Sequence, residues 1–302
     1  MPDFADRPEN QTSEGAMRSP RTLLAAHNIR PKKQLGQNFL ADPGTAAMIV
    51  NRSGISPEDL VLEIGAGLGA LTIPVARIAQ KVYAVDVDPE ILDILKTEIL
   101  THRLENVVIV DRNILKIDIQ ELAEGAGRKI LVIGNLPYNI SSQVLIRLIK
   151  YRSTIDRAVL MFQKELAHRI TAFPGNKDYG RLSVMLQYCA DIKRVAKVNA
   201  SVFFPRPKVD SEVLEVRFKT TVDFAADDER FFSSVVKAAF GKRRKTLKNA
   251  LAASELKIDS HTAQTVLEQS DINPVRRAET LSVEEFVRLS NYLKPLTPGQ
   301  VH

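Results

Sequence analysis

The sequence predicts an α/β protein in which a parallel β-sheet, covered by helices on both faces, is followed by a small all-helical domain. From about residue 45 to residue 220, short apolar runs alternate with stretches of helical periodicity. Near-continuous apolar strands separated by helices are typical of parallel sheets buried on both faces. From about residue 221 onward only helical patterns remain. We therefore divide the chain into a disordered N-terminal tail (1–28), an α/β domain (29–220) and a helical domain (221–302).

The individual elements follow from local patterns. Seven strands are expected, at 60–65, 81–87, 106–110, 129–134, 157–162, 192–198 and 211–218. Helices are expected at 71–79 and at 89–100, the second with Asp88 as N-cap and Pro89 in its first turn. The last two strands follow each other without an obvious helix between them, so the sheet should end in an antiparallel pair. Helices at 228–241, 242–254, 260–270 and 282–293 complete the chain, and Ser282 with Glu285 forms a capping box at the start of the last one.

The composition restricts the class of protein. The balance of 42 Lys and Arg against 36 Asp and Glu gives a net charge of +6, a weak indication of an anionic partner. Cys189 is the only cysteine, and it lies in an apolar stretch that favours a small buried side chain over a nucleophile. The histidines show no metal-ligand spacing, so no metal is expected. The sequence has no apolar run of about 18 residues and no signal peptide, which predicts a cytoplasmic protein without a membrane span.

The first strand leads into a glycine-rich loop, EIGAGLGALT (63–72). Gly65 and Gly67 let the backbone turn tightly and approach a ligand, and Asp86, at the end of the second strand, is placed to bind a ribose diol. These glycines also satisfy the dinucleotide fingerprint, so an NAD-dependent dehydrogenase is the alternative. Glu63 separates the two hypotheses. A carboxylate aimed into the loop would repel a pyrophosphate but attract the sulfonium and ammonium groups of S-adenosylmethionine, through water or backbone.

The fourth strand ends in GNLPYNIS (134–141). A simple turn would need only an Asn or a Pro. The complete order suits a pocket for an adenine, whose exocyclic amine must pyramidalise before it can be methylated. The Asn135 side-chain oxygen and the Leu136 carbonyl would accept its hydrogen bonds. Pro137 confines Leu136 to extended geometry, and Tyr138 offers a flat face for an extruded base.

Five segments in the same order carry a family resemblance: QLGQNFL (34–40), EIGAGLGALT (63–72), GNLPYNIS (134–141), FFPRPKVDS (203–211) and FGKRRKTLKNAL (240–251). They resemble the bacterial small-subunit ribosomal RNA adenine dimethyltransferases, the kasugamycin-sensitivity enzymes, over about residues 30 to 292. The resemblance implies a Rossmann-like, seven-stranded sheet of the class I S-adenosylmethionine-dependent methyltransferases. It also implies dimethylation of two adjacent adenines near the 3′ end of 16S rRNA, within the small ribosomal subunit or its precursor, by a monomer.

The same resemblance assigns roles to individual residues. Asn38 and Leu40 would contact the cofactor, Asn113 would lie near its adenine, Asn135 would serve both sites, and Phe203 would stack on the target base opposite Tyr138. The alternative for Phe203 is an ordinary core aromatic before a Pro-rich turn. The family commonly has Glu at position 86 and Asp at position 113, so cofactor affinity is in question here. Asp111 could replace the second carboxylate only after a two-residue register shift.

A basic run in the C-terminal domain is expected to bind RNA. It contributes Lys242, Arg243, Arg244, Lys245 and Lys248 at the start of a predicted helix, on which Arg244 and Lys248 would share one face. Phosphate contacts of this kind position a substrate without reading its sequence. The alternative is a solvated basic face.

Other functions remain open at this stage. A non-enzymatic rRNA-binding assembly factor would not need Glu63, the glycines or the NLPY sequence. A 23S rRNA methylase of the antibiotic-resistance type is the nearest rival within the enzymes, although FGKRRKTLKNAL and the sizeable helical domain favour the small-subunit enzyme. A DNA adenine methylase would need its own base-reading domain, which the sequence does not suggest.

Overall fold

The computed structural model describes residues 18–124, 127–242 and 244–297. A seven-stranded sheet forms its centre, with the spatial order β4-β3-β2-β5-β6-β9-β7. The strands are β2 (Leu60–Ile64), β3 (Lys81–Asp86), β4 (Val107–Asp111), β5 (Ile130–Asn135), β6 (Ile155–Gln163), β7 (Ala190–Val198) and β9 (Ser211–Phe218). The five neighbouring strands β4, β3, β2, β5 and β6 pair in parallel, whereas β9 is antiparallel to both β6 and β7. The seven predicted strands and the antiparallel end of the sheet are confirmed.

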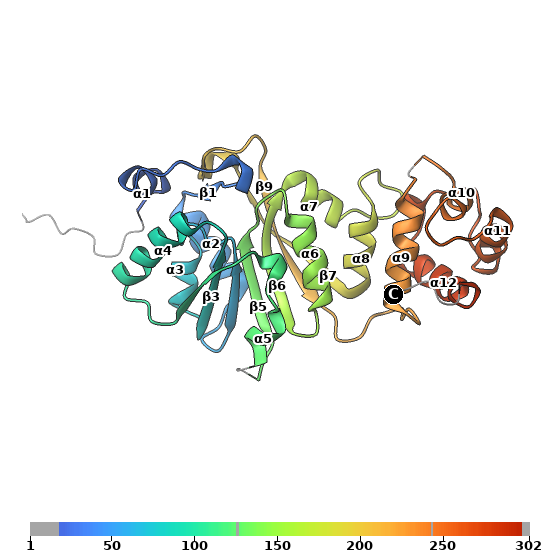
Figure 1. Cartoon of the computed structure of the whole chain (residues 1–302), viewed down its shortest axis with the longest axis horizontal. Coiled ribbons are helices and arrows are strands. Elements are labelled where there is room, and N and C mark those ends of the chain that lie inside the picture. Colours follow the sequence, from blue (N-terminus) through green and yellow to red (C-terminus); the bar gives the residue numbers. More distant parts are fainter. Residues whose placement is uncertain (1–17, 125–126, 243, 298–302) are drawn as a thin grey trace, which may run out of the picture.

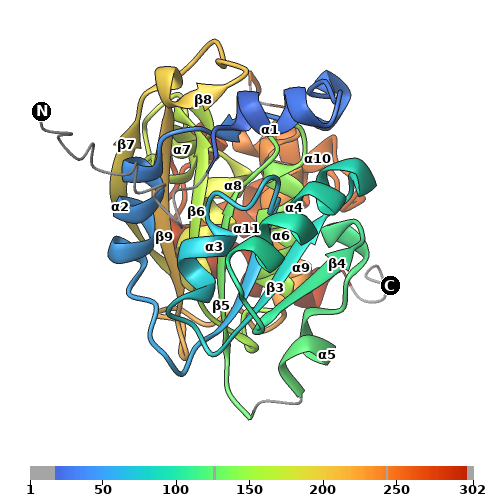
Figure 2. The same cartoon turned by 90° about the vertical axis from the view of Figure 1, so that its left-hand side faces the viewer.

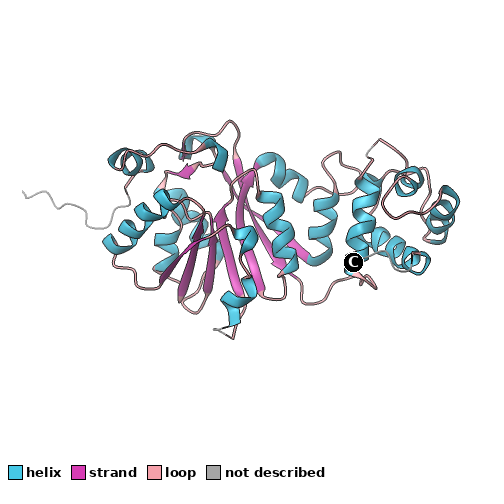
Figure 3. Ribbon diagram, viewed as in Figure 1, coloured by secondary structure: helices cyan, strands magenta, loops and turns pink. Residues whose placement is uncertain are grey.

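Helices cover both faces of the sheet (Figures 1 and 3). The α/β part contains α1 (Pro20–Ala26), α2 (Pro43–Ser53), α3 (Thr72–Ala76), α4 (Pro89–Thr101), α5 (Ile119–Glu124), α6 (Ser141–Lys150), α7 (Lys164–Ile170) and α8 (Arg181–Cys189). The alternation of side chains along β2 separates two cores. Leu62 faces a cluster that includes α6 and α8, whereas its neighbour Val61 faces one that includes α2 and α3. Asp88 caps α4 and Pro89 begins it, as the sequence predicts.

The C-terminal helices are α9 (Glu229–Phe240), α10 (Leu247–Ala252), α11 (Ser260–Gln269) and α12 (Val283–Leu293), and they form one end of the molecule (Figure 1). The predicted capping box between Ser282 and Glu285 opens α12. These helices share a hydrophobic cluster with the sheet through α8. At this junction, the rings of Tyr188 and Phe232 lie 4.7 Å apart.

The N-terminal segment departs from the predicted disordered tail. Residues 1–17 lie outside the described residues, but Pro20–Ala26 form helix α1, which Ser19 caps. Leu23 and Leu24 on this helix are buried with Phe39, Leu68 and Ile91, so packing stabilises a helix too short to form alone. The chain then passes over the end of the sheet and forms β1 (Phe39–Leu40), which pairs with β8 (Phe203–Phe204). Both views show α1 and this ribbon at the same end of the sheet (Figures 1 and 2).

Candidate functional site

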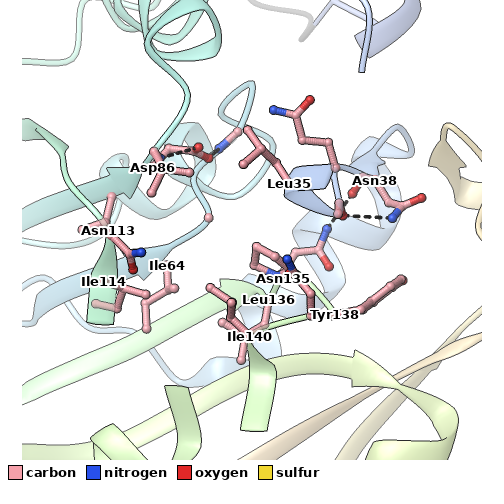
Figure 4. Close-up of a pocket in the computed structure, with 18 of the residues that line it drawn as sticks. Leu35, Asn38, Ile64, Asp86, Asn113, Ile114, Asn135, Leu136, Tyr138 and Ile140 are labelled. Atoms are coloured by element: carbon pink, nitrogen blue, oxygen red, sulfur yellow. Dashed lines mark hydrogen bonds between the residues drawn. The ribbon is translucent and has the colours of Figure 1, made fainter. Parts of the chain in front are cut away.

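A cavity of about 230 Å³ lies where β2, β3 and β5 end, beside the segment that follows β4 (Figure 4). Such a crevice outside the carboxyl ends of parallel strands is where open α/β sheets bind ligands. It is lined by Leu35, Gly36, Gln37, Asn38, Phe39, Ile64, Gly65, Gly67, Val85, Asp86, Val87, Arg112, Asn113, Ile114, Asn135, Leu136, Pro137, Tyr138, Asn139 and Ile140. The glycine loop and the NLPY corner therefore share one pocket.

The backbone of the glycine-rich loop favours glycine at two positions that line the pocket. Gly65 and Gly67 adopt φ angles of 76° and 53°, which favour glycine. A Cβ atom at Gly65 would lie 3.1 Å from the Asn135 carbonyl oxygen, and one at Gly67 would lie 3.2 Å from the Phe39 ring. The backbone of the loop can therefore approach a ligand closely.

Asp86 connects this loop to the end of β3. Its carboxylate accepts hydrogen bonds from the backbone N–H groups of Gly67 (2.9 Å), Val87 (2.7 Å) and Asp88 (3.1 Å). Burial raises the pKa of Asp86, and the three donors oppose that effect. Asp86 lines the pocket, and its binding of a ribose diol stays a prediction.

Glu63 does not line the pocket, but Thr72 at the end of the loop and Asp86 are close enough to shift its pKa, so its action on a cofactor stays a prediction. Its side chain belongs to a buried position of β2 and is 1% exposed. Among the described residues, no hydrogen-bond partner reaches its Oε2 atom. Burial raises the pKa of this carboxyl from 4.5 to about 8, since the charged form is desolvated. The Glu63 carboxyl could therefore influence a ligand only by its electrostatic field, because the backbone of the loop lies between them.

The NLPY corner is held rigidly. The Asn135 amide nitrogen donates to the Asn38 carbonyl at 2.9 Å, and the amide oxygen is left on the side of the pocket where Tyr138 lies (Figure 4). The Pro137 carbonyl accepts hydrogen bonds from the Ile140 N–H (3.2 Å) and the Ser141 hydroxyl (2.9 Å). The Tyr138 hydroxyl lies 3.2 Å from that of Ser211. In the described part of the chain, no donor bonds the Leu136 carbonyl, which stays available as an acceptor.

Two of the residues assigned by resemblance are not brought to the pocket. Leu40 is 2% exposed and Phe203 is 4% exposed, and both pack in the core between the sheet and α2. They are paired with each other across the β1–β8 ribbon. The alternative interpretation of Phe203, an ordinary core aromatic, matches this position, and its stacking on a target base stays a prediction.

The segment after β4 supplies one wall of the pocket. Asn113 lines it, and the Asn113 side-chain oxygen also accepts from the Leu115 N–H at 2.9 Å, capping a short 3₁₀ helix. Asp111 pairs with Asp86 in the sheet and does not line the pocket, so it does not substitute for a carboxylate at position 113. Arg112 does line the pocket, although no motif in the sequence pointed to it.

Other pocket residues were also missed. Ile64, Val85, Ile114 and Ile140 provide apolar walls, and Leu35 through Gln37 bring the N-terminal segment over the opening. Ile64 and Val85 could have been predicted as pocket residues from the sequence, because they directly precede Gly65 and Asp86. Residues 35–37 could not, since their place at the pocket depends on how the chain folds back across the sheet.

The basic run does not begin a helix. Helix α10 starts at Leu247, and the Lys245 N–H bonds to the Lys242 carbonyl at 2.8 Å in a turn that precedes it. The predicted shared helix face of Arg244 and Lys248 is therefore wrong. Gly241 ends α9, and the Leu247 N–H instead bonds to the Arg276 carbonyl at 2.7 Å, which fixes where α10 starts. Lys242, Arg244 and Lys245 are exposed, Lys248 is half-buried, and Arg243 lies outside the described residues.

The described residues contain no helix long and apolar enough to cross a membrane. They also contain no group of three or more His, Cys, Asp or Glu side chains arranged to hold a metal ion. Cys189 is fully buried, and burial raises the pKa of its thiol to about 12, which agrees with the interpretation as a structural side chain.

A mostly parallel seven-stranded sheet with this pocket defines a class I S-adenosylmethionine-dependent methyltransferase. The pocket fits that cofactor, because the Asp86 carboxylate and the glycines at 65 and 67 line it together. The chain belongs to the ribosomal RNA adenine dimethylase family, whose model matches residues 28–294.

Individual relatives agree with this assignment. The chain is 53% identical over 277 residues to the ribosomal RNA small subunit methyltransferase A of Desulforapulum autotrophicum, covering 92% of this chain and 97% of the relative. It is 40% identical over 273 residues to the protein of the same name from Magnetococcus marinus, covering 90% and 95%. A dimethyladenosine transferase from Plasmodium falciparum is similar in structure, with a TM-score of 0.70, 27% identity, and coverage of 83% of this chain and 95% of the other.

Proposed function

We propose that this protein uses S-adenosylmethionine to dimethylate the N6 amines of two adjacent adenines near the 3′ end of 16S rRNA. The substrate would be the small ribosomal subunit or its precursor. The observation that carries the proposal is the single pocket in which the Asn135–Tyr138 corner faces the glycine loop and Asp86. The shared name of the relatives, ribosomal RNA small subunit methyltransferase A, supports the choice of subunit.

The cofactor half of the pocket is assigned as follows. Asp86 accepts hydrogen bonds from the ribose, Gly65 and Gly67 allow close backbone approach, and Asn113 accepts from the adenine amine. When bound, S-adenosylmethionine supplies an electrophilic methyl group. Asn38 holds the cofactor from the opposite side, where it lines the pocket beside Phe39.

The target half binds the adenine that is to be modified. The Asn135 side-chain oxygen and the Leu136 carbonyl accept hydrogen bonds from its amine, which draws the nitrogen lone pair out of the ring. Pro137 fixes the direction of the Leu136 carbonyl, and the Tyr138 ring stacks on the extruded base. These acceptors are fixed before the substrate arrives, and such preorganised electrostatics is a principal source of catalysis.

The C-terminal domain holds the RNA. Lys242, Arg244 and Lys245 are exposed on the turn before α10 and Lys248 is half-buried on its first turn. Arg243 belongs to the same proposed cluster by sequence. A basic turn can contact phosphates without a regular helix face, because phosphate contacts depend mainly on charge.

The direct test incubates the protein with unmethylated small subunits and labelled S-adenosylmethionine, and then maps the modified bases. We expect two adjacent dimethylated adenines near the 3′ end of 16S rRNA. Large subunits are the matched control, because a 23S rRNA methyltransferase is also similar in structure, with a TM-score of 0.62, 25% identity, and coverage of 84% of this chain and 99% of the other. Label confined to the large subunit, or no label in either, would overturn the proposal.

A further inference from the structure

The orientation of the Asn135 amide is decided by the segment that crosses the pocket, which we call the N-terminal strap (residues 29–41). A terminal amide has an acceptor oxygen and a donor nitrogen that exchange places when it rotates by 180°. An inverted Asn135 would point N–H donors at an amine that also carries N–H donors. The hydrogen bond from the Asn135 amide nitrogen to the Asn38 carbonyl, 2.9 Å long, prevents that inversion.

The strap is tied to the protein through one buried carboxylate. The Gln37 side-chain oxygen accepts from the Lys32 N–H (2.7 Å), and its nitrogen donates to Asp88 Oδ2 (2.7 Å). Lys32 Nζ lies 2.7 Å from Asp88 Oδ1 and 2.5 Å from a Glu90 oxygen. The Asp88 side chain is fully buried, whereas the Lys32 side chain stays partly exposed.

Asp88 is itself anchored to the cofactor half of the site. Its N–H donates to Asp86 Oδ1 at 3.1 Å, and its Oδ1 accepts from the Glu90 N–H at 3.3 Å at the start of α4. The Asp86 carboxylate in turn holds the Gly67 N–H. A continuous set of hydrogen bonds and one short backbone step thus join the glycine loop, the end of β3, the strap and the Asn135 amide.

We propose that Gln37 and Asp88 are positioning residues for methyl transfer, which act by holding the Asn38 carbonyl against the Asn135 amide. The assignment rests on the proposed function of Asn135 as the acceptor for the target amine. Asp88 does not line the pocket, and its contact with Asp86 is made by its backbone N–H, so a change of the Asp88 side chain acts on the strap through Gln37 and Lys32.

The polarity of the Gln37–Asp88 hydrogen bond makes the proposal testable. Gln37→Glu sets two carboxylates against each other, while Asp88→Asn sets two amide nitrogens against each other because the Lys32 N–H fixes the Gln37 oxygen. The double variant restores one donor and one acceptor with their direction reversed. Asn caps a helix as well as Asp does, so α4 keeps its cap.

The first measurement needs no substrate. We would follow the side-chain amide protons of Asn135 by ¹⁵N-edited NMR in the free protein. Their protection from solvent exchange should be lost in Gln37→Glu and in Asp88→Asn, and should return in the double variant. A thermal melt of each variant identifies global unfolding. Gln37→Leu, which adds no charge, is a second control: the Asn135 amide protons should lose protection in it, and adding Asp88→Asn should not restore that protection.

The second measurement is turnover at saturating small subunit. A displacement of about 1 Å of a reacting group can cost on the order of a hundredfold, so we expect each single variant to lose at least about tenfold in kcat and the double variant to recover most of it. Unchanged Asn135 protection in the single variants, or losses that add in the double variant, would overturn the proposal. Failure of wild type to methylate small subunits would instead refute the proposed function, while the NMR measurement would still stand.

Discussion

Replacing Glu63 by Gln tests how the buried carboxyl under the glycine loop is linked to stability and cofactor binding. Glu63 is 1% exposed, and its pKa is raised by burial from 4.5 to about 8. Between these two values the folded protein binds a proton that the unfolded chain has released. The unfolding free energy of the wild type therefore falls as pH rises through this window.

The size of the effect follows from the width of the window. Each pH unit inside it costs about 1.4 kcal/mol of unfolding free energy, so the cumulative loss at pH 7 is about 3 kcal/mol. Gln has nearly the same shape but cannot ionise. The difference in unfolding free energy between Glu63→Gln and wild type should therefore rise with pH from about 5 to about 8 and level off above that.

The assay is denaturant unfolding of both proteins, without cofactor, at a series of pH values. All other titrating groups are common to the two proteins, so the difference curve isolates Glu63. Glu105→Gln, the same change at an exposed position, is the matched control for the substitution itself. Parallel curves for wild type and Glu63→Gln would refute the reasoning.

Cofactor binding gives an independent readout of the same group. A sulfonium cation above the loop favours the ionised carboxyl, so binding of S-adenosylmethionine at pH 7 should release more protons from wild type than from Glu63→Gln. Calorimetry in two buffers with different ionisation heats counts those protons. Equal proton release in the two proteins would mean that Glu63 does not respond to the cofactor.

Three further predictions concern separate parts of the site. Asn135→Ala should reduce methyl transfer by about a hundredfold or more with RNA binding nearly intact, and an activity above about a tenth of wild type would contradict its role. Asn113→Asp should tighten S-adenosylmethionine binding several-fold, up to about tenfold, by adding charge to the hydrogen bond while keeping the 3₁₀-helix cap; calorimetry that finds no change would leave Asn113 as a cap only. Replacing Arg244, Lys245 and Lys248 by Gln should leave cofactor affinity unchanged and reduce the slope of log affinity for small subunits against log salt by about 0.7 to 0.9 for each lost phosphate contact, whereas parallel slopes would mark a solvated face.

Much of the fold could be predicted because it is encoded locally. The apolar runs that form β2, β3 and β5 predict buried strands from local sequence alone. A parallel sheet then brings the carboxyl ends of these strands together. Asp86 and Asn135 terminate two of these strands, so a shared pocket followed from the sequence alone. The order of the motifs also predicted the family, which the match over residues 28–294 confirms.

The tertiary structure decided what each side chain near the pocket touches. Leu40 and Phe203 lie in motifs that the family resemblance assigns to the site, yet their pairing in the β1–β8 ribbon turns both into the core. Glu63 precedes the glycine loop, but its place on a strand covered on both faces buries its side chain and keeps it out of the pocket lining. The direction of a side chain depends on which segments pack against it, and those segments are distant in sequence.

Contacts with residues distant in sequence also decide the structure near the two ends of the chain. The run 242–248 has helical composition, but α10 begins only at Leu247, whose N–H donates a hydrogen bond to the Arg276 carbonyl. The strap lies against the Asn135 amide, and its Lys32 and Gln37 side chains meet Asp88, more than fifty residues away. Local sequence therefore determined the strands, the loop and the chemistry available at their ends, while long-range hydrogen bonds and packing decided which of those groups face the ligand.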